Sequence, residues 1–191
     1  MQKLLKAAIF LFAAIILPSC EENFNSSNSD IYIDCPILFS KIYVNHAWGD
    51  QYSGWYVDLE GQQYDFDEDL APKIDIAHNS AISDEILFNS LESATNTDTY
   101  LEQSILAEAI KLINMAYKGA LSDIACGCAD FGEISYFTFI RDHEGDDCRS
   151  ILLYQAGDCA QKNLDPEAIE LFELLREHVD NDTSQIPCSP E

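Results

Sequence analysis

Apolar and polar residues alternate with a period of two in residues 55–66, on both sides of Glu60-Gly61. This pattern predicts a β-hairpin that turns at the glycine, because successive side chains of a strand point to opposite faces of a sheet. Residues 31–44 are also rich in apolar side chains, and a proline interrupts them. They predict one or two short strands, since proline cannot donate a hydrogen bond to a strand ladder.

The same alternation returns in residues 131–140 and 149–156, which predict a second hairpin. Folding about the turn between them brings the start of one strand opposite the end of the other. We therefore predict that Cys159 forms a disulfide with Cys126 or Cys128, because neighbouring antiparallel strands bring Cβ atoms close enough to bridge.

Helical spacing of apolar residues predicts helices between the two hairpins. Ser83 can cap a short helix over residues 84–91. Thr99 and Glu102 match the capping box S/T-x-x-E at the start of a longer helix that continues to Ala116.

A last helix begins after Asp165, a good N-cap, with Pro166 at its first position. Phe172, Leu175 and Val179 continue its buried face. The complete order of elements predicts an α+β fold of two layers, in which two β-hairpins are each followed by helix. It leaves open a degenerate ββα duplication.

The first 20 residues have the three parts of an export signal. Lys3 and Lys6 form the positive region, the eleven residues 7–17 form the apolar region, and Ser19 is the small residue before Cys20. A membrane-spanning helix needs about 20 apolar residues, so this run is too short to span a bilayer.

The stretch Leu17 to Cys20, Leu-Pro-Ser-Cys, resembles the lipobox of bacterial lipoproteins. The resemblance implies that cleavage removes residues 1–19. It also implies that Cys20 carries a diacylglycerol and an acylated amino terminus. An anchor of more than one acyl chain holds a protein stably on a membrane. The alternative is an ordinary signal peptide. Glu21 and Glu22 resemble a surface-export signal of lipoproteins in one group of Gram-negative bacteria. We therefore expect an outer-membrane lipoprotein, with the outer surface favoured over a periplasm-facing position.

The mature chain divides into a tether and one domain. Residues 20–30 are mostly polar and predict a flexible tether, and residues 31–191 are long enough for a single α+β domain. An even number of cysteines in an exported domain predicts disulfides. The six candidates are Cys35, Cys126, Cys128, Cys148, Cys159 and Cys188. A metal site on Cys126-Gly-Cys128 is the alternative, although it lacks the Cys-x₂-Cys spacing.

The mature body carries eight basic and 34 acidic residues, a net charge of −26. Nucleic-acid binding is disfavoured, because it depends on Lys and Arg neutralising phosphates. Docking of the protein surface onto anionic lipid is disfavoured for the same reason. We expect the membrane to be reached through the lipid anchor alone.

An aromatic stretch in the sequence HAWGDQYSGWY is the main candidate ligand surface. Its members Trp48, Tyr52, Trp55 and Tyr56 could stack on a sugar or a peptide. The alternative, which we favour, is that alternate members fill the core of the first hairpin. In that case Trp55 should be more buried than Tyr56.

Asp65, Asp67 and Asp69 have the spacing that begins an EF-hand calcium loop. Leu70 stands where the loop needs glycine, and Ile76 stands where it needs the bidentate glutamate. A solvated acidic end of the hairpin is therefore favoured over a Ca²⁺ site, and no other cofactor is indicated.

No catalytic motif is present: the sequence has no G-x-S-x-G elbow, P-loop, dinucleotide fingerprint or H-E-x-x-H. The segments GWYVDLEGQQYDFD and LLYQAGDCAQKNLDPEAIELFELL are similar to parts of small uncharacterised exported bacterial proteins, a resemblance that implies no activity. We expect a non-catalytic lipoprotein of the cell envelope or surface that binds a glycan, peptide or protein. The alternatives are a secreted-protease inhibitor or protective factor and a small carboxylate-dependent hydrolase.

Overall fold

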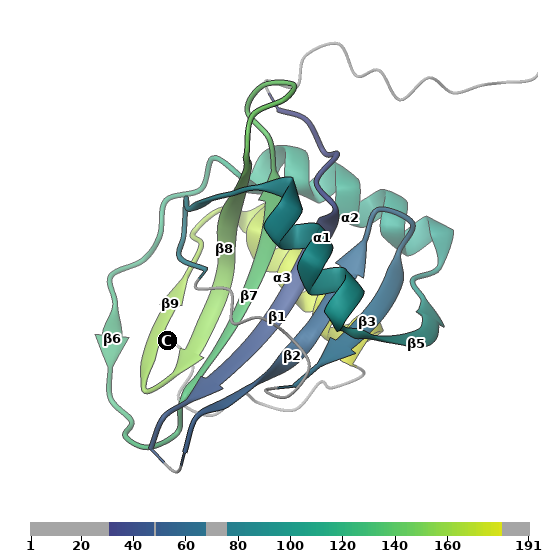
Figure 1. Ribbon diagram of the computed structural model, residues 1–191. Helices are drawn as coiled ribbons and strands as arrows, with labels where there is room; N and C mark the ends of the chain where they lie inside the picture. The colour runs from purple at the N-terminus through teal and green to yellow at the C-terminus, as the bar shows by residue number, and fades with distance from the viewer. Residues whose placement is uncertain (1–30, 48, 68–75, 181–191) are drawn as a thin grey trace, which may run out of the picture.

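The computed structural model describes residues 31–47, 49–67 and 76–180. Its strands form one antiparallel sheet in the order β5-β3-β2-β1-β7-β8-β9-β6, with β4 paired to β8 beside this path (Figure 1). The strands are β1 (Ile37–Asn45), β2 (Gln51–Asp58), β3 (Gln62–Phe66), β4 (Ala81–Ile82), β5 (Thr95–Tyr100), β6 (Ala125–Cys126), β7 (Glu133–Ile140), β8 (Cys148–Gly157) and β9 (Cys159–Lys162). The helices are α1 (Asp84–Ser93), α2 (Gln103–Ala116), α3 (Pro166–Leu175) and a π-helical turn, η1 (Arg176–Asp180).

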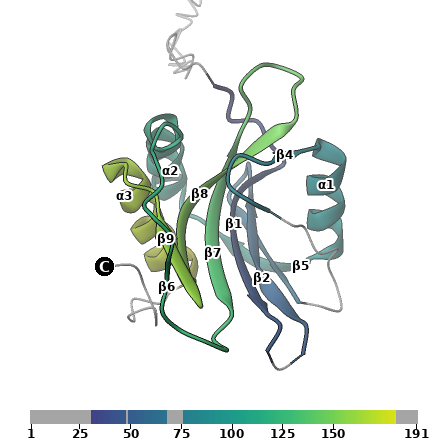
Figure 2. The ribbon, with the colours of Figure 1, turned by 90° about the vertical axis from the view of Figure 1, so that its left-hand side faces the viewer.

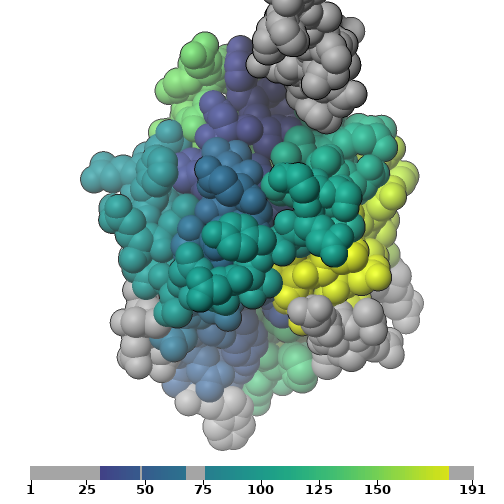
Figure 3. All heavy atoms as spheres, turned by 90° about the vertical axis from the view of Figure 1, so that its right-hand side faces the viewer, coloured from purple at the N-terminus to yellow at the C-terminus, as the bar shows by residue number. Residues whose placement is uncertain are grey.

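Helices cover both faces of the sheet. Figure 2 shows α1 on one face and the pair α2 and α3 on the other. In the space-filling view the teal-green atoms of α2 lie directly beside the yellow atoms of α3 and η1 (Figure 3). The predicted α+β class is correct, but the predicted two layers are wrong, because the central strands carry apolar side chains on both faces and need a helical layer on each.

The two predicted hairpins are present. In β2–β3 the Asp58 carboxylate accepts hydrogen bonds from the amides of Glu60 and Gln62, and Gly61 takes φ +82° in the turn. In β7–β8 the register runs from the pair Glu133 and Gly157 at the open end to Ile140 and Arg149 near the turn.

The start of α2 corrects the sequence prediction. Thr99 is not part of a capping box: it lies in β5, where its carbonyl accepts a hydrogen bond from Gln62 Nε2 at 3.0 Å. Glu102 is itself the N-cap, and its side chain makes no capping bond. The strand β5 was not expected, because its sequence TNTDTY has no apolar alternation. Pairing with β3 decides its conformation.

The other helices begin as predicted. The Ser83 side chain accepts from the amide of Ile86 at the start of α1, and the Asp165 side chain accepts from the amide of Glu167 at the start of α3. In α3 the buried face continues through η1 to Val179. Within the described residues, no helix is both long and apolar enough to cross a membrane.

Two disulfides join distant parts of the chain. Cys35, just before β1, is bonded to Cys148 at the start of β8. Cys126 in β6 is bonded to Cys159 in β9, one of the two pairings expected from the second hairpin. Cys128 is disulfide-bonded as well, and Cys188 lies outside the described residues.

Candidate functional site

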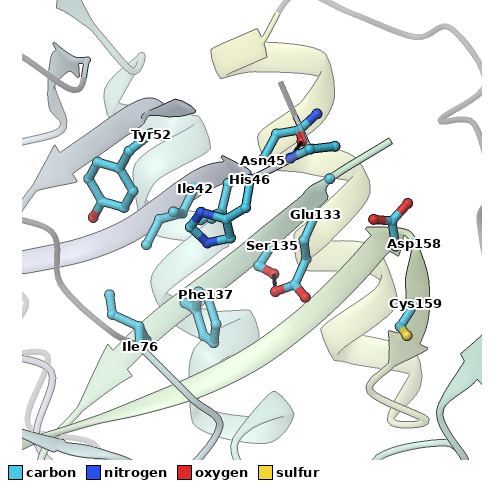
Figure 4. Close-up of a pocket in the computed structure, with 13 residues that line it drawn as sticks. Ile42, Asn45, His46, Tyr52, Ile76, Glu133, Ser135, Phe137, Asp158 and Cys159 are labelled. Atoms are coloured by element: carbon cyan, nitrogen blue, oxygen red, sulfur yellow. Dashed lines mark hydrogen bonds between the residues drawn. The ribbon is translucent and has the colours of Figure 1, made fainter. Parts of the chain in front are cut away.

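A pocket of about 580 Å³ opens on the α1 side of the sheet, at the end where β1 finishes and β7 begins (Figure 4). Its size is within the range of small-molecule sites. It is lined by Ile42, Val44, Asn45, His46, Ala47, Tyr52, Ile76, Gly132, Glu133, Ser135, Phe137, Asp158 and Cys159.

Strand register places the side chains that form the base of the pocket. Tyr52 of β2 lies opposite Val44 of β1, and Val44 lies opposite Glu133 of β7. In the next row that points to the same face, Ile42 lies opposite Ser135. Side chains two residues apart on a strand share a face, so these residues form one surface that is apolar on β1 and β2 and polar on β7.

Two glycines beside the polar side of this surface allow neighbouring backbone segments to approach closely. Gly157 lies opposite Glu133 and takes φ +128°, and a Cβ there would lie 2.0 Å from the carbonyl oxygen of Gly132. Gly132 takes φ +76°, and a Cβ there would lie 2.4 Å from the carbonyl oxygen of Val44. The close approach of the backbones at this end of the sheet therefore requires both glycines.

The acidic side chains of the pocket come from β7 and the β8–β9 turn. Glu133 accepts a hydrogen bond from the Ser135 hydroxyl at 2.9 Å, and Figure 4 shows both side chains between those of Phe137 and Asp158. Asp158 accepts from the amide of Phe131 at 2.8 Å, which holds the loop before β7. Two carboxylates therefore line one pocket, each with a defined orientation.

The segment before β4 crosses β8 and forms one side of the pocket through Ile76. It is held by His78, whose Nδ1 accepts a hydrogen bond from the amide of Leu152 at 3.1 Å. Burial lowers the pKa of His78, and the positive charge of Arg149 lowers it further. The imidazole is thus neutral, with its proton on Nε2, because a protonated Nδ1 could not accept.

The structure separates the predicted aromatic surface. Tyr52 lines the pocket, whereas Trp48 lies outside the described residues. Trp55 and Tyr56 are buried on opposite faces, with 5% and 0% of their surfaces exposed, so neither can form an open ligand surface. The expectation that Trp55 is the more buried of the two is wrong, because α1 and its neighbours cover the Tyr56 face as fully as α2 and α3 cover the other.

Trp55 is part of a polar cluster on the α3 side of the sheet. Its indole Nε1 donates to Asp180 at 2.6 Å, and Lys41 Nζ and the Tyr136 hydroxyl donate to the same carboxylate at 2.9 and 2.5 Å. Asp180 is the last residue of η1, so the cluster holds the end of the helical layer against β1, β2 and β7. All three donors converge on the Asp180 carboxylate, which gives the cluster a structural role.

The candidate calcium residues do not converge in the described part of the chain. Asp65 lies in β3 and accepts a hydrogen bond from Gln63 Nε2, Asp67 follows that strand, and Asp69 lies outside the described residues. Among the residues that the structure describes, no group of three or more His, Cys, Asp or Glu could hold a metal ion.

Sequence reasoning missed the polar members of the pocket, above all Glu133, Ser135 and Asp158. The alternation along β7 could have revealed them, because Glu133 and Ser135 point to the same face of the strand as the buried Phe137 and Phe139. A carboxylate at a core-facing position of a buried strand indicates that the sheet is uncovered at that point.

Comparison with known proteins gives no relative from which a role could be inferred. No family model, no curated protein and no solved structure matches the chain.

Proposed function

We propose that this protein is a non-catalytic lipoprotein of the cell envelope, anchored through Cys20, that binds its ligand in the pocket at the β1 and β7 end of the sheet. The observation that carries the proposal is the pocket itself. It combines an apolar surface with a few fixed polar groups, which is the usual composition of a binding site. The lipobox resemblance supports the anchor, and Glu21-Glu22 favours the outer surface.

The pocket favours an apolar ligand, or one apolar group of a larger partner, over a flat sugar ring. Sugar recognition uses exposed aromatic faces, and Trp55 and Tyr56 are buried in the core. Tyr52 contributes to the pocket together with Ile42, Val44 and Phe137. A peptide side chain or a small amphipathic molecule therefore suits the surface better than an oligosaccharide.

A ligand screen with a pocket-filling variant tests this function. The full chain in detergent is screened by NMR against peptides, glycans and small amphipathic molecules. Val44→Trp places a large ring on the base of the pocket, whereas Met115→Trp adds the same ring at an exposed position of α2. Ligands that bind should lose at least about 10-fold in affinity with Val44→Trp and be unchanged with Met115→Trp. A ligand that is insensitive to Val44→Trp would place the binding site elsewhere.

A hydrolase is the second candidate, because Glu133 and Asp158 line the same pocket and paired carboxylates can act as acid and base. Hydrolysis of a glycoside panel by the wild type, abolished by Glu133→Gln and by Asp158→Asn, would favour it over simple binding. Activity that survives both substitutions would exclude this pocket as its source.

A degenerate duplication of a ββα unit is the proposed origin of the fold. It is supported by α2 and α3, which pack side by side on one face of the sheet, and each comes after one of the two hairpins in the sequence, although β4, α1 and β5 lie between the first hairpin and α2.

A further inference from the structure

The charges around the pocket are of one sign. The charged side chains among its described lining residues are Glu133 and Asp158, and no lysine or arginine is among them. His46 also lines it, but its Nδ1 lies 2.9 Å from the carboxylate of Asp50. A ligand therefore meets acceptors and negative charge on one side of the pocket.

The opposite side is apolar. Ile42 and Val44 on β1, Tyr52 on β2 and Phe137 on β7 present a continuous hydrocarbon and aromatic surface next to Glu133. Figure 4 shows Ile42, Phe137 and Ile76 on the side of the pocket away from Asp158. The two carboxylates thus lie toward one side of the pocket and these three apolar side chains toward the other.

Glu133 is held ready to accept a further hydrogen bond. One of its oxygens already accepts from Ser135, whose own side chain is held in the sheet with 4% of the residue exposed. A carboxylate has about four acceptor sites, so the second oxygen remains available to a donor that enters the pocket.

From this separation we infer that the ligand is a small organic amine: a primary ammonium on an apolar or aromatic stem. The ammonium donates to Glu133 near Asp158, and the stem packs on Ile42, Val44 and Phe137. An anionic group would meet two carboxylates without a compensating cation, which opposes binding of carboxylates and phosphates. This inference rests on the proposed function, since it specifies what the same pocket binds.

Three molecules of nearly equal shape test the inference by calorimetry on the full chain in detergent: 2-phenylethylamine, 2-phenylethanol and 3-phenylpropionate at pH 7. We expect the amine to bind most tightly, the alcohol about 5-fold more weakly and the acid more weakly still. The difference is modest because Glu133 is exposed at the edge of the pocket, where water screens its charge.

Glu133→Gln keeps the shape of the side chain and an acceptor for Ser135 but removes the charge. It should weaken the amine about 5-fold and leave the alcohol unchanged. Glu170→Gln removes an equal charge from the exposed face of α3 and should change neither. If both substitutions weakened binding of the amine equally, the effect would come from net charge alone, and this result would overturn the inference.

The outcomes distinguish a failure of the proposed ligand class from a failure of the proposed function. Equal or tighter binding of the alcohol or the acid, lost in Val44→Trp, would overturn the amine inference while the pocket remained a binding site. Failure of all three molecules to bind would also overturn the inference, and the broader screen with Val44→Trp would then decide alone whether the pocket binds anything.

Discussion

At the scale of single residues, Asp180 is expected to contribute to stability through its buried carboxylate. Its side chain is 5% exposed and accepts hydrogen bonds from Trp55, Lys41 and Tyr136. Asp180→Asn replaces one acceptor oxygen with a donor and leaves Lys41 without its counter-charge. We expect a loss of about 2–3 kcal/mol in the free energy of unfolding, measured by urea denaturation. Asp123→Asn, in an exposed loop, should change it by less than about 0.5 kcal/mol. Equal effects of the two substitutions would contradict this role.

His78 is the residue whose titration should affect stability. Its pKa is lowered in the folded state by burial and then by Arg149, so the unfolded chain takes up the proton first as pH falls. The contribution of neutral His78 is therefore complete above its ordinary pKa of 6.5 and is lost as pH falls below that value. His78→Asn keeps an acceptor for the amide of Leu152 and does not titrate.

Urea denaturation at pH 8 and pH 5 compares the two proteins. The wild type should lose stability on acidification relative to His78→Asn, and the comparison cancels the protonation of the many carboxylates that both proteins share. A stability difference that is the same at both pH values would show that His78 does not titrate in this way.

At the scale of elements, the two disulfides should differ in their contribution. Cys126–Cys159 closes a separation of 33 residues between β6 and β9, and Cys35–Cys148 closes one of 113 residues. A longer closed loop restricts the unfolded chain more, which gives about 4 kcal/mol for the first and about 5 kcal/mol for the second. Replacing both cysteines of each pair with serine and measuring urea denaturation should give the larger loss for Cys35 and Cys148. The opposite order would show that native contacts, rather than loop length, dominate.

At the scale of the whole molecule, the proposed lipid anchor would decide where the pocket is presented. Cys20→Ser would remove the sulfur of the lipid anchor proposed above. We expect the wild type to sediment with membranes and to partition into detergent, and the variant to lose both properties, because the proposed acyl chains would supply the membrane affinity. Protease treatment of intact cells would then distinguish the outer surface from the periplasm. Retention of the variant in the membrane fraction would contradict a lipid anchor.

The sequence by itself determined the local structure wherever short-range chemistry is sufficient. Alternation with a glycine turn predicted the hairpin β2–β3, and side-chain caps at Ser83 and Asp165 predicted the starts of α1 and α3. At Thr99 the same local rule failed, because β5 pairs with β3 and the Thr99 carbonyl accepts a hydrogen bond from the side chain of Gln62.

Only the tertiary structure decided which faces are buried and where the sheet remains open. Trp55 and Tyr56 are neighbours in the sequence and point to opposite faces of the sheet, and both are buried because helices cover both faces. Glu133 became a candidate ligand residue only through its register opposite Val44 and its place beside Asp158. The physical reason is that burial and strand register depend on contacts between residues far apart in the chain, which no local pattern specifies.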